Sequence, residues 1–269
     1  MGSLVTALAS FLDVKKNKGL WFIRMDDLDP PREVTGAKQQ ILDALAAHGL
    51  RPDRNVDWQS GHTAAYHAAL EQLAPASFYC NCSRKSLARL AVYPGTCRLQ
   101  TSQREDAAIR IHVRDKDLSF NDRVVGTQSC NVAEDYGDFI IRRRDGLIAY
   151  NLATAVDDGA DSITSVLRGQ DLLHVTAPQR YLMHELGLTP PDYAHIPLLT
   201  YADGTKLSKQ TGAPPLVDAN ADANLRAALY YLGMPDPSDQ LTVDQCITWG
   251  LSHWSLSDVP KRLPIYKVE

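Results

Sequence analysis

The chain has 269 residues, of which 44% are hydrophobic and 22% are charged, and its formal net charge is −4. This composition is that of a soluble globular protein with enough residues to bury a sizeable core. No apolar run is long enough to cross a bilayer, and the first one, at residues 4–12, contains polar residues and follows no basic residue. We therefore expect no membrane span, no signal peptide and a cytoplasmic location.

The five cysteines and the acidic balance bear on the kind of site to expect. The count is odd and three cysteines are clustered, which argues against a secreted disulfide framework and for metal binding in a reducing compartment. Because phosphate contacts need clustered Lys and Arg, the net charge is weak evidence against nucleic-acid binding. The basic clusters at residues 15–18 and 142–144 are interpreted as solvated faces.

The beginning of the chain has an α/β pattern. A helix is expected from Ser3, because the apolar residues that follow have helical spacing. Residues 20–23 are typical of a short buried strand, and a polar loop follows at residues 24–31, where open α/β sheets place their ligands. Two more helices follow. The residues expected to face inward on them are Ile41, Leu42, Leu45, Tyr66, Ala69, Leu70 and Leu73.

The segment from residue 75 to residue 150 is rich in β patterns. Apolar residues alternate with polar ones over residues 109–113, which predicts a half-exposed strand. Asp145 and Gly146 separate two short apolar runs, which is a strong signal for a β-hairpin. We expect this segment to interrupt the α/β pattern as an insertion.

The α/β pattern resumes after the insertion. Residues 163–167 and 196–200 have the character of strands. A helix between them is expected to open at Thr176 and Pro178 and to end near Gly187. A polar loop over residues 203–212 follows the second strand.

The tail is predicted to be helical. Leu225, Ala228, Leu229 and Leu232 form one stripe, and Thr242 can begin a capping box. The predicted fold class is therefore α/β, with a Rossmann-like parallel sheet. The expected divisions are residues 1–74 and 151–212 for the two parts of the α/β domain, 75–150 for the insertion and 213–269 for the tail.

The first candidate for chemistry is the loop at residues 206–210, which reads K-L-S-K-Q. The ammonium groups of Lys206 and Lys209 can supply positive charge where a triphosphate develops negative charge. A charged surface turn is the alternative, because short basic motifs recur by chance.

The second candidate is the cysteine cluster. Cys80, Cys82 and Cys97 can supply three thiolates to a tetrahedral zinc ion, and one further donor would close the site. Spacing alone does not nominate Tyr93 as that donor, and three buried thiols are the alternative. Such a zinc site would be structural, holding together an insertion with little core of its own.

The third candidate is a set of three polar residues on loops. Asp26 follows the first strand, Tyr150 follows the hairpin, and Arg168 ends another strand. A carboxylate can hold an α-ammonium group, and an arginine can bind a substrate carboxylate in a bidentate pair. Each residue alone is more typical of an ordinary ion pair or hydrogen bond, and only their joint placement on loops favours a site.

Four motifs, taken together and in order, resemble those of glutamyl-tRNA synthetases, which are class I nucleotide-binding enzymes. Residues 24–29 read R-M-D-D-L-D, similar to the R-I-E-D-L-D signature of that family. They are followed by A-Y-N-L-A at residues 149–153 with Asp157 and Asp158, by L-R-G-Q-D-L-L at residues 167–173 and by the K-L-S-K-Q loop, a form of K-M-S-K-S. The set is highly specific, although no single member is.

The C-x-C…Y-x-x-x-C cluster, with only a short helical tail after the α/β domain, resembles the glutamyl-Q tRNA(Asp) synthetase family. That family activates glutamate with ATP and Mg²⁺ and transfers it to the queuosine base of aspartate tRNA. The resemblance implies one structural zinc ion bound by Cys80, Cys82, Tyr93 and Cys97. It implies glutamate binding by Asp26, Tyr150 and Arg168. It implies ATP binding by Gly2, Ser3 and Lys209, with Lys206 and Lys209 neutralising the departing pyrophosphate.

The start of the sequence departs from the family pattern. The family opens with a strand and F-A-P-S-P-T-G-x-L-H-x-G-S-L, and only the last part of that motif matches residues 1–4 here. The opening strand, the first histidine of the motif and an arginine that binds glutamate have no counterpart. We therefore expect the native protein to begin earlier. Asp26 also stands where the family more often has glutamate, which keeps the charge but shortens its reach.

Two other functions stay open. The chain is also compatible with a catalytic fragment of a glutamyl-tRNA synthetase that acts on glutamate tRNA. It is further compatible with a non-catalytic, zinc-stabilised module that binds tRNA or glutamate, because the ATP motif is incomplete. We expect a monomer with no membrane partner, in which Cys130 and Cys246 are packing residues.

Overall fold

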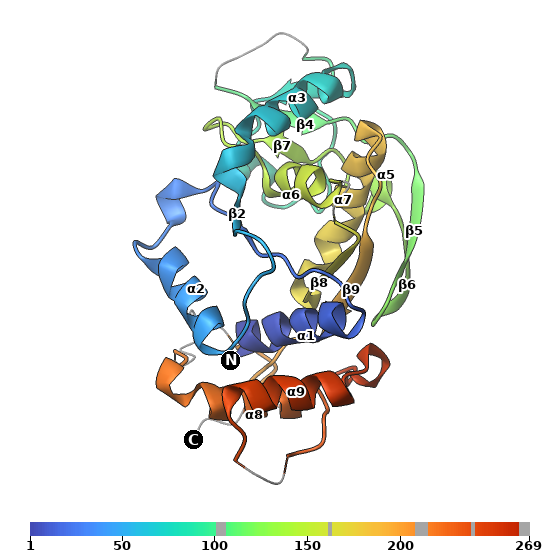
Figure 1. The fold of residues 1–269 in the computed structure, drawn as a ribbon. Helices are drawn as coiled ribbons and strands as arrows, with labels where there is room; N and C mark the ends of the chain where they lie inside the picture. The colour runs from blue at the N-terminus through green and yellow to red at the C-terminus, as the bar shows by residue number, and fades with distance from the viewer. Residues whose placement is uncertain (101–105, 161–162, 208–214, 238–239, 264–269) are drawn as a thin grey trace.

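The computed structural model describes residues 1–100, 106–160, 163–207, 215–237 and 240–263, and its ribbon is shown in Figure 1. The helices are α1 (Gly2–Lys16), α2 (Ala37–Ala47), α3 (Thr63–Leu73), α4 (Arg84–Leu87), α5 (Val132–Asp135), α6 (Tyr150–Asp158), α7 (Leu173–Leu186), α8 (Ala221–Tyr231) and α9 (Val243–His253). The strands are β1 (Arg24–Met25), β2 (Asp57–Trp58), β3 (Ser77–Cys80), β4 (Ala108–Ile111), β5 (Asp117–Asp122), β6 (Gly126–Asn131), β7 (Ile140–Arg142), β8 (Ser165–Gly169) and β9 (Asp192–Ile196). Among these described helices, none has the length and apolar character needed to span a membrane.

The strands form three small sheets, and the α/β class is confirmed. β1 and β2 form a parallel pair, and β3, β4 and β7 form an antiparallel sheet. The third sheet has the order β6-β5-β9-β8, in which β9 is parallel to both β8 and β5 while β6 is antiparallel to β5. The expected parallel sheet is therefore mixed, because the β5–β6 hairpin of the middle segment joins β9 where Asp122 pairs with Tyr193.

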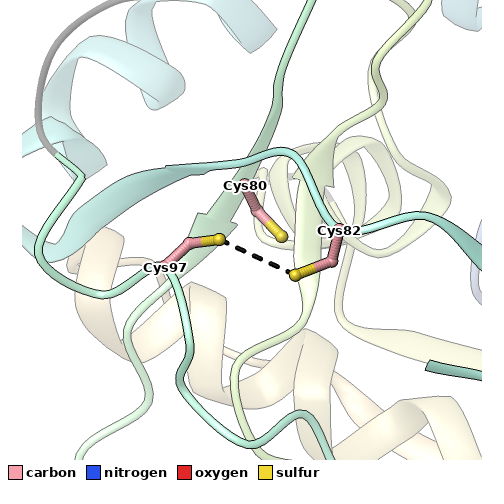
Figure 2. A group of neighbouring side chains, drawn as sticks. All are labelled: Cys80, Cys82 and Cys97. Carbon is pink, nitrogen blue, oxygen red and sulfur yellow. Dashed lines mark hydrogen bonds between the residues drawn. The ribbon is translucent and has the colours of Figure 1, made fainter. Parts of the chain in front are cut away.

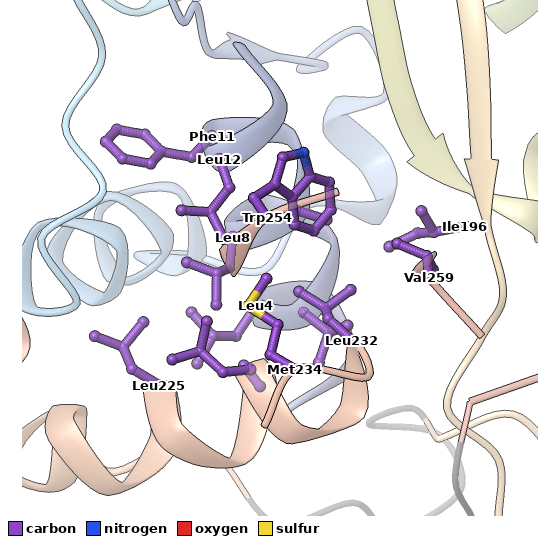
Figure 3. Close-up of a cluster of buried hydrophobic side chains, with 14 of the residues drawn as sticks. Leu4, Leu8, Phe11, Leu12, Ile196, Leu225, Leu232, Met234, Trp254 and Val259 are labelled. Carbon is purple, nitrogen blue, oxygen red and sulfur yellow. The ribbon is translucent and has the colours of Figure 1, made fainter. Parts of the chain in front are cut away.

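Helix α1 lies at the centre of the larger hydrophobic core. Leu4, Leu8 and Leu12 are buried on it and pack with residues of α8 and of the segment after α9, as Figure 3 shows. Burying each such side chain away from water contributes about 1.5–3 kcal/mol to the free energy of folding. The contact is close, because a Cβ atom on Gly250 of α9 would lie 3.1 Å from the side chain of Leu12. In Figure 1, α1 separates the tail helices from β8 and β9.

A second core joins the antiparallel sheet to helices α6 and α7. Ile111 of β4 and Ile141 of β7 are fully buried against Leu152 of α6 and Leu182 of α7. This core fixes the start of α6 and the end of β7, so the segment between them has a defined position. That position matters because Tyr150 is the first residue of α6.

Several local predictions are confirmed. Helix α3 buries Tyr66, Ala69 and Leu73 as expected. Gly146 has a φ of +88° in the turn of the predicted hairpin, and the N–H of Arg143 donates to the carbonyl of Leu147 at 2.8 Å. The capping box at Thr242 is also present, with Gln245 as its partner.

Residues 20–23 were expected to form a strand, and that prediction is wrong. Strand β1 begins only at Arg24, and Leu20 is 66% exposed. The preceding backbone is joined to a single neighbouring segment, through the N–H of Asp53 to the carbonyl of Trp21 and the N–H of Asp57 to the carbonyl of Ile23, both at 2.9 Å. These contacts align the segment with residues 53–57 but do not form the regular β-ladder of a strand.

Other expectations fail because burial depends on distant parts of the chain. Ile41 is 47% exposed, and α2 has no fully buried residue. Strand β9 ends at Ile196, where the predicted strand was to begin. Helix α7 starts at Leu173, so Thr176 and Pro178 lie inside it and do not open it. Arg110 of the supposedly half-exposed strand is buried, because its guanidinium lies 4.1 Å from the centre of the Tyr93 ring.

Candidate active site

Arg24 joins the loop after β1 to the end of α6. Its Nε donates to Oδ1 of Asp26 at 2.8 Å, its Nη1 donates to Asp158, and its Nε lies 3.6 Å from Asp157. Burial alone would lower the pKa of Arg24, but the carboxylates of Asp158 and Asp26 raise it above its usual value. The guanidinium is therefore a fixed positive charge, and it holds Asp26 in place.

Asp157 accepts hydrogen bonds from three side chains. Its carboxylate accepts hydrogen bonds from Gln59 Nε2 at 2.7 Å, from His62 Nδ1 at 2.8 Å and from the hydroxyl of Tyr66 at 2.8 Å. Because these donors come from the turn after β2 and from α3, the carboxylate ties both elements to α6. The result is a rigid polar wall behind Asp26.

Arg168 is held by three side chains near the end of β8. Its Nε donates to His195 Nε2 at 3.0 Å, and its Nη2 donates to Thr176 Oγ1 at 2.9 Å and to Gln179 Oε1 at 2.8 Å. Within the described part of the chain, Nη1 makes no hydrogen bond. The expected bidentate pair with a substrate would need Nη2 as well, so Nη1 is the group that this arrangement offers to a ligand.

The three residues proposed for glutamate lie around one cavity of about 1420 Å³. Asp26, Tyr150 and Arg168 all line it, together with the wall residues Asp157 and Asp158. Tyr150 is 40% exposed, whereas Arg168 is buried. The structure thus brings together three residues that lie far apart in the sequence.

A smaller cavity of about 420 Å³ lies beside the first. Gly2 and Ser3 at the start of α1 line it, as does Lys206, and residues 21–24 line both cavities. Lys206 is ion-paired with Asp171. Lys209, the other predicted phosphate-binding lysine, lies outside the described residues.

The three clustered cysteines meet in space, as Figure 2 shows. Their sulfur atoms lie within 4.8 Å of one another, and Cys82 and Cys97 are 3.7 Å apart. The hydroxyl oxygen of Tyr93 lies 3.5 Å from the sulfur of Cys80 and 3.8 Å from that of Cys82. A tetrahedral ion with bonds of about 2.3 Å to sulfur and 2.1 Å to oxygen requires ligand separations of roughly 3.6–3.8 Å. The separation of Cys82 from Cys97 and those of Tyr93 from Cys80 and Cys82 are close to these values, so the side chains present are compatible with a zinc ion.

The charge around the cluster favours thiolate at Cys80. Burial alone would raise its pKa, but its hydrogen-bonding contacts with Tyr93 and Arg110 lower the pKa of Cys80 to about 7. Arg144 donates from Nη2 to the carbonyl of Asn81 at 2.8 Å, so one of the basic residues assigned to a solvated face instead supports this loop. Cys246 lies in the larger core and Cys130 packs against the second one, as expected for packing residues.

Comparison with known proteins identifies the family. The family described as tRNA synthetases class I (E and Q), catalytic domain, matches residues 1–91 and 89–224. The chain belongs to this family. A relative named Glutamyl-Q tRNA(Asp) synthetase, from Pseudomonas aeruginosa PAO1, is 45% identical over 265 residues, which is 97% of this chain and 90% of the relative. A protein of the same name from Serratia proteamaculans is 42% identical over 266 residues, which is 97% of this chain and 88% of the relative.

Solved structures support the fold. The glutamate-tRNA synthetase of Elizabethkingia anophelis superposes with a TM-score of 0.80 at 23% identity, covering 99% of this chain. A glutamate tRNA ligase from Elizabethkingia meningosepticum, in complex with its amino acid, superposes with a TM-score of 0.81 at 23% identity. The chain spans 65% and 64% of the length of these two proteins.

The sequence did not reveal several residues of this site. Asp157 and Asp158 were noted only as part of a motif, and Gln59, His62 and His195 were not singled out. Their roles depend on contacts across 27 to 134 residues of sequence, which no local pattern encodes. The pair of acidic residues at the end of α6 was the only available signal.

His62 should make stability depend on pH. The hydrogen bond to Asp157 and the nearby carboxylate of Asp57 raise the pKa of His62 in the folded state. The contribution of His62 to the free energy of unfolding is therefore fully present below its unfolded-state pKa of about 6.5. It is lost as pH rises through the higher pKa of the folded state. We expect the free energy of unfolding to decline less from pH 6 to pH 8 in His62→Gln than in the parent, as measured by urea denaturation.

The matched control is His67→Gln, which changes an exposed side chain on α3. This variant should retain the parental pH dependence. Parallel curves for the parent and His62→Gln would contradict the assignment of the ion pair.

Proposed function

We propose that this protein activates glutamate with ATP and transfers it to the queuosine base of aspartate tRNA. The observation that carries the proposal is that Asp26, Tyr150 and Arg168 line one cavity, directly beside the cavity lined by Gly2, Ser3 and Lys206. An amino acid in the first cavity and a nucleotide in the second would meet along residues 21–24. The names of the relatives support the same substrate and tRNA.

Charge complementarity supports glutamate as the amino acid. The carboxylate of Asp26 would pair with the α-ammonium group, and Nη1 of Arg168 would bind the side-chain carboxylate, which takes no part in the reaction. The hydroxyl of Tyr150 would donate a hydrogen bond to the substrate. Because Arg24 already fixes Asp26, little conformational entropy would be lost on binding.

The smaller cavity suits the phosphates of ATP. Helix α1 begins at Gly2, and the free N–H groups of a helix N-terminus attract phosphate. Lys206 and Lys209 would neutralise the pyrophosphate as it leaves, and Mg²⁺ bound with ATP would screen the remaining phosphate charge. This lysine assignment rests on the family motif, supported at Lys206 by its place on the cavity wall.

The reaction would proceed in two steps. An α-carboxylate oxygen of glutamate attacks the α-phosphorus of ATP in line, which forms glutamyl-adenylate and releases pyrophosphate. A hydroxyl of the queuosine diol then attacks the activated carbonyl carbon, and AMP leaves. The residues described above hold the reactants and stabilise charge, which are the main contributions available to phosphoryl chemistry of this kind.

The cysteine cluster is proposed to hold one structural zinc ion through Cys80, Cys82, Cys97 and Tyr93. All four positions would be filled by protein, so the ion would stabilise the segment and take no part in the reaction. The ligand separations and the low pKa of Cys80 support this assignment. Burial raises the pKa of Tyr93, so the bound ion would have to favour its deprotonation.

Transfer to queuosine can be separated from ordinary aminoacylation. We expect labelled glutamate to enter queuosine-containing aspartate tRNA, and not aspartate tRNA that lacks the modification or glutamate tRNA. Removing the terminal adenosine should leave transfer intact, whereas periodate oxidation of the queuosine diol should abolish it. The measurement is acid-precipitable label on each purified tRNA.

The alternatives predict different outcomes of the same assay. Charging of glutamate tRNA that depends on its terminal adenosine would identify a glutamyl-tRNA synthetase fragment. Binding of tRNA or glutamate without any transfer would identify a non-catalytic module. Either result would overturn the proposed function.

Zinc content tests the cysteine proposal independently of activity. We expect about one zinc ion per purified chain by elemental analysis. Cys82→Ser should lose the zinc and lower the melting temperature by about 5 °C or more. Cys130→Ser, which removes a cysteine outside the cluster, should keep it. Parental protein that is purified without zinc, and whose melting temperature does not change when zinc is added, would contradict the assignment.

A further inference from the structure

Resting on the proposed function, we propose that His195, oriented by Asp122, is a positioning residue for the arginine that binds glutamate. Its neutral imidazole accepts a hydrogen bond from Nε of Arg168 and thereby directs Nη1 of that arginine toward the cavity. Asp122, His195 and Arg168 are each less than a tenth exposed, so the contact is shielded from water. Neither Asp122 nor His195 is among the residues that line the cavity.

Asp122 is fixed at the end of β5 by four donors. Its Oδ1 accepts from the backbone N–H groups of Val124, Val125 and His195 at 3.0, 2.8 and 3.2 Å. Its Oδ2 lies 2.6 Å from Nδ1 of His195. Burial alone would raise the pKa of Asp122, but the hydrogen bonds from His195 and the backbone lower it below its usual value. Asp122 is therefore an ionised carboxylate, which can only accept hydrogen bonds.

The carboxylate determines which nitrogen of His195 carries the proton. Because both oxygens of Asp122 accept, Nδ1 must carry a hydrogen, and the neutral ring then has a lone pair at Nε2. Nε2 faces the Nε–H group of Arg168 at 3.0 Å and the hydroxyl of Thr176 at 3.1 Å, which can donate to the same lone pair. A proton on Nε2 would place two donors, and in the imidazolium form two cations, against each other. The arginine beside Nε2 thus favours the neutral tautomer that carries its hydrogen on Nδ1.

The hydrogen bond orients the whole guanidinium. With Nε directed at His195 and both Nη2 hydrogens directed at Thr176 and Gln179, the plane of the group cannot rotate. Nη1 then points away from these partners. A donor fixed before the substrate arrives binds it with less loss of entropy than a mobile one. Losing the acceptor at His195 should therefore weaken glutamate binding without changing the chemistry that follows.

The decisive variant is Asp122→Asn. The asparagine can donate to Nδ1 of His195, which moves the ring proton to Nε2 and leaves Nε of Arg168 without its acceptor at His195. We expect the KM for glutamate in ATP–pyrophosphate exchange to rise about tenfold, the loss expected for one hydrogen bond to a charged group. The kcat and the KM for ATP should change less than about twofold, because the lost hydrogen bond affects the binding of glutamate and not the binding of ATP or the chemical step.

The tautomer itself is the second readout. Nitrogen NMR of uniformly labelled protein should show the hydrogen of His195 on Nδ1 in the parent and on Nε2 in Asp122→Asn. Asp138→Asn is the matched control, because Asp138 is also buried and accepts from a backbone N–H and from Arg98, but does not line the cavity. This control should lower stability and leave the glutamate KM unchanged.

A second variant covers the case in which Asp122→Asn does not fold. His195→Asn can still donate to Asp122 but has no atom at the position of Nε2, so it should show the same selective rise in glutamate KM. An unchanged glutamate KM in the folded variants, or a loss matched by Asp138→Asn, would overturn the positioning role. A parent that binds no glutamate in isothermal titration would overturn the proposed function instead, while the NMR spectra would still report the tautomer.

Discussion

The site depends on the contact between Arg24 and the two carboxylates at the end of α6. Asp157 and Asp158 lie more than 130 residues from Arg24 in the sequence, and the ion pairs hold the loop after β1 against the helix that begins with Tyr150. A buried charge left without its partner costs several kcal/mol, so these groups have to stay together. The positions of Asp26 and Tyr150 follow from that constraint.

The same principle operates on the other side of the cavity. Arg168 is also a buried cation, and it is held by His195, Thr176 and Gln179 from α7 and β9. Two fixed arginines therefore face one cavity from two sheets, with Asp26 beside one of them. Helix α1 packs between the strands and the tail and brings its N-terminus to the adjoining cavity. The arrangement places both arginines and the N-terminus of α1 at two adjoining cavities.

The sequence predicted what depends on neighbouring residues. Helices α1 and α3, the turn at Gly146 and the cap at Thr242 each have a local signal, and all four are present. The meeting of Asp26, Tyr150 and Arg168 around one cavity could be predicted from their positions near the ends of strands and helices. The exposure of Ile41 could not be predicted, because it depends on which surface α2 meets. Asp122 and His195 are 73 residues apart, and neither shows a local pattern that announces their contact.

The most direct test of the account is glutamate-dependent ATP–pyrophosphate exchange without tRNA, by this chain and by a form extended with the opening strand of the family. The account predicts exchange with glutamate and none with aspartate or glutamine. Absence of glutamate-dependent exchange in both forms, with the fold intact by circular dichroism, would contradict the account.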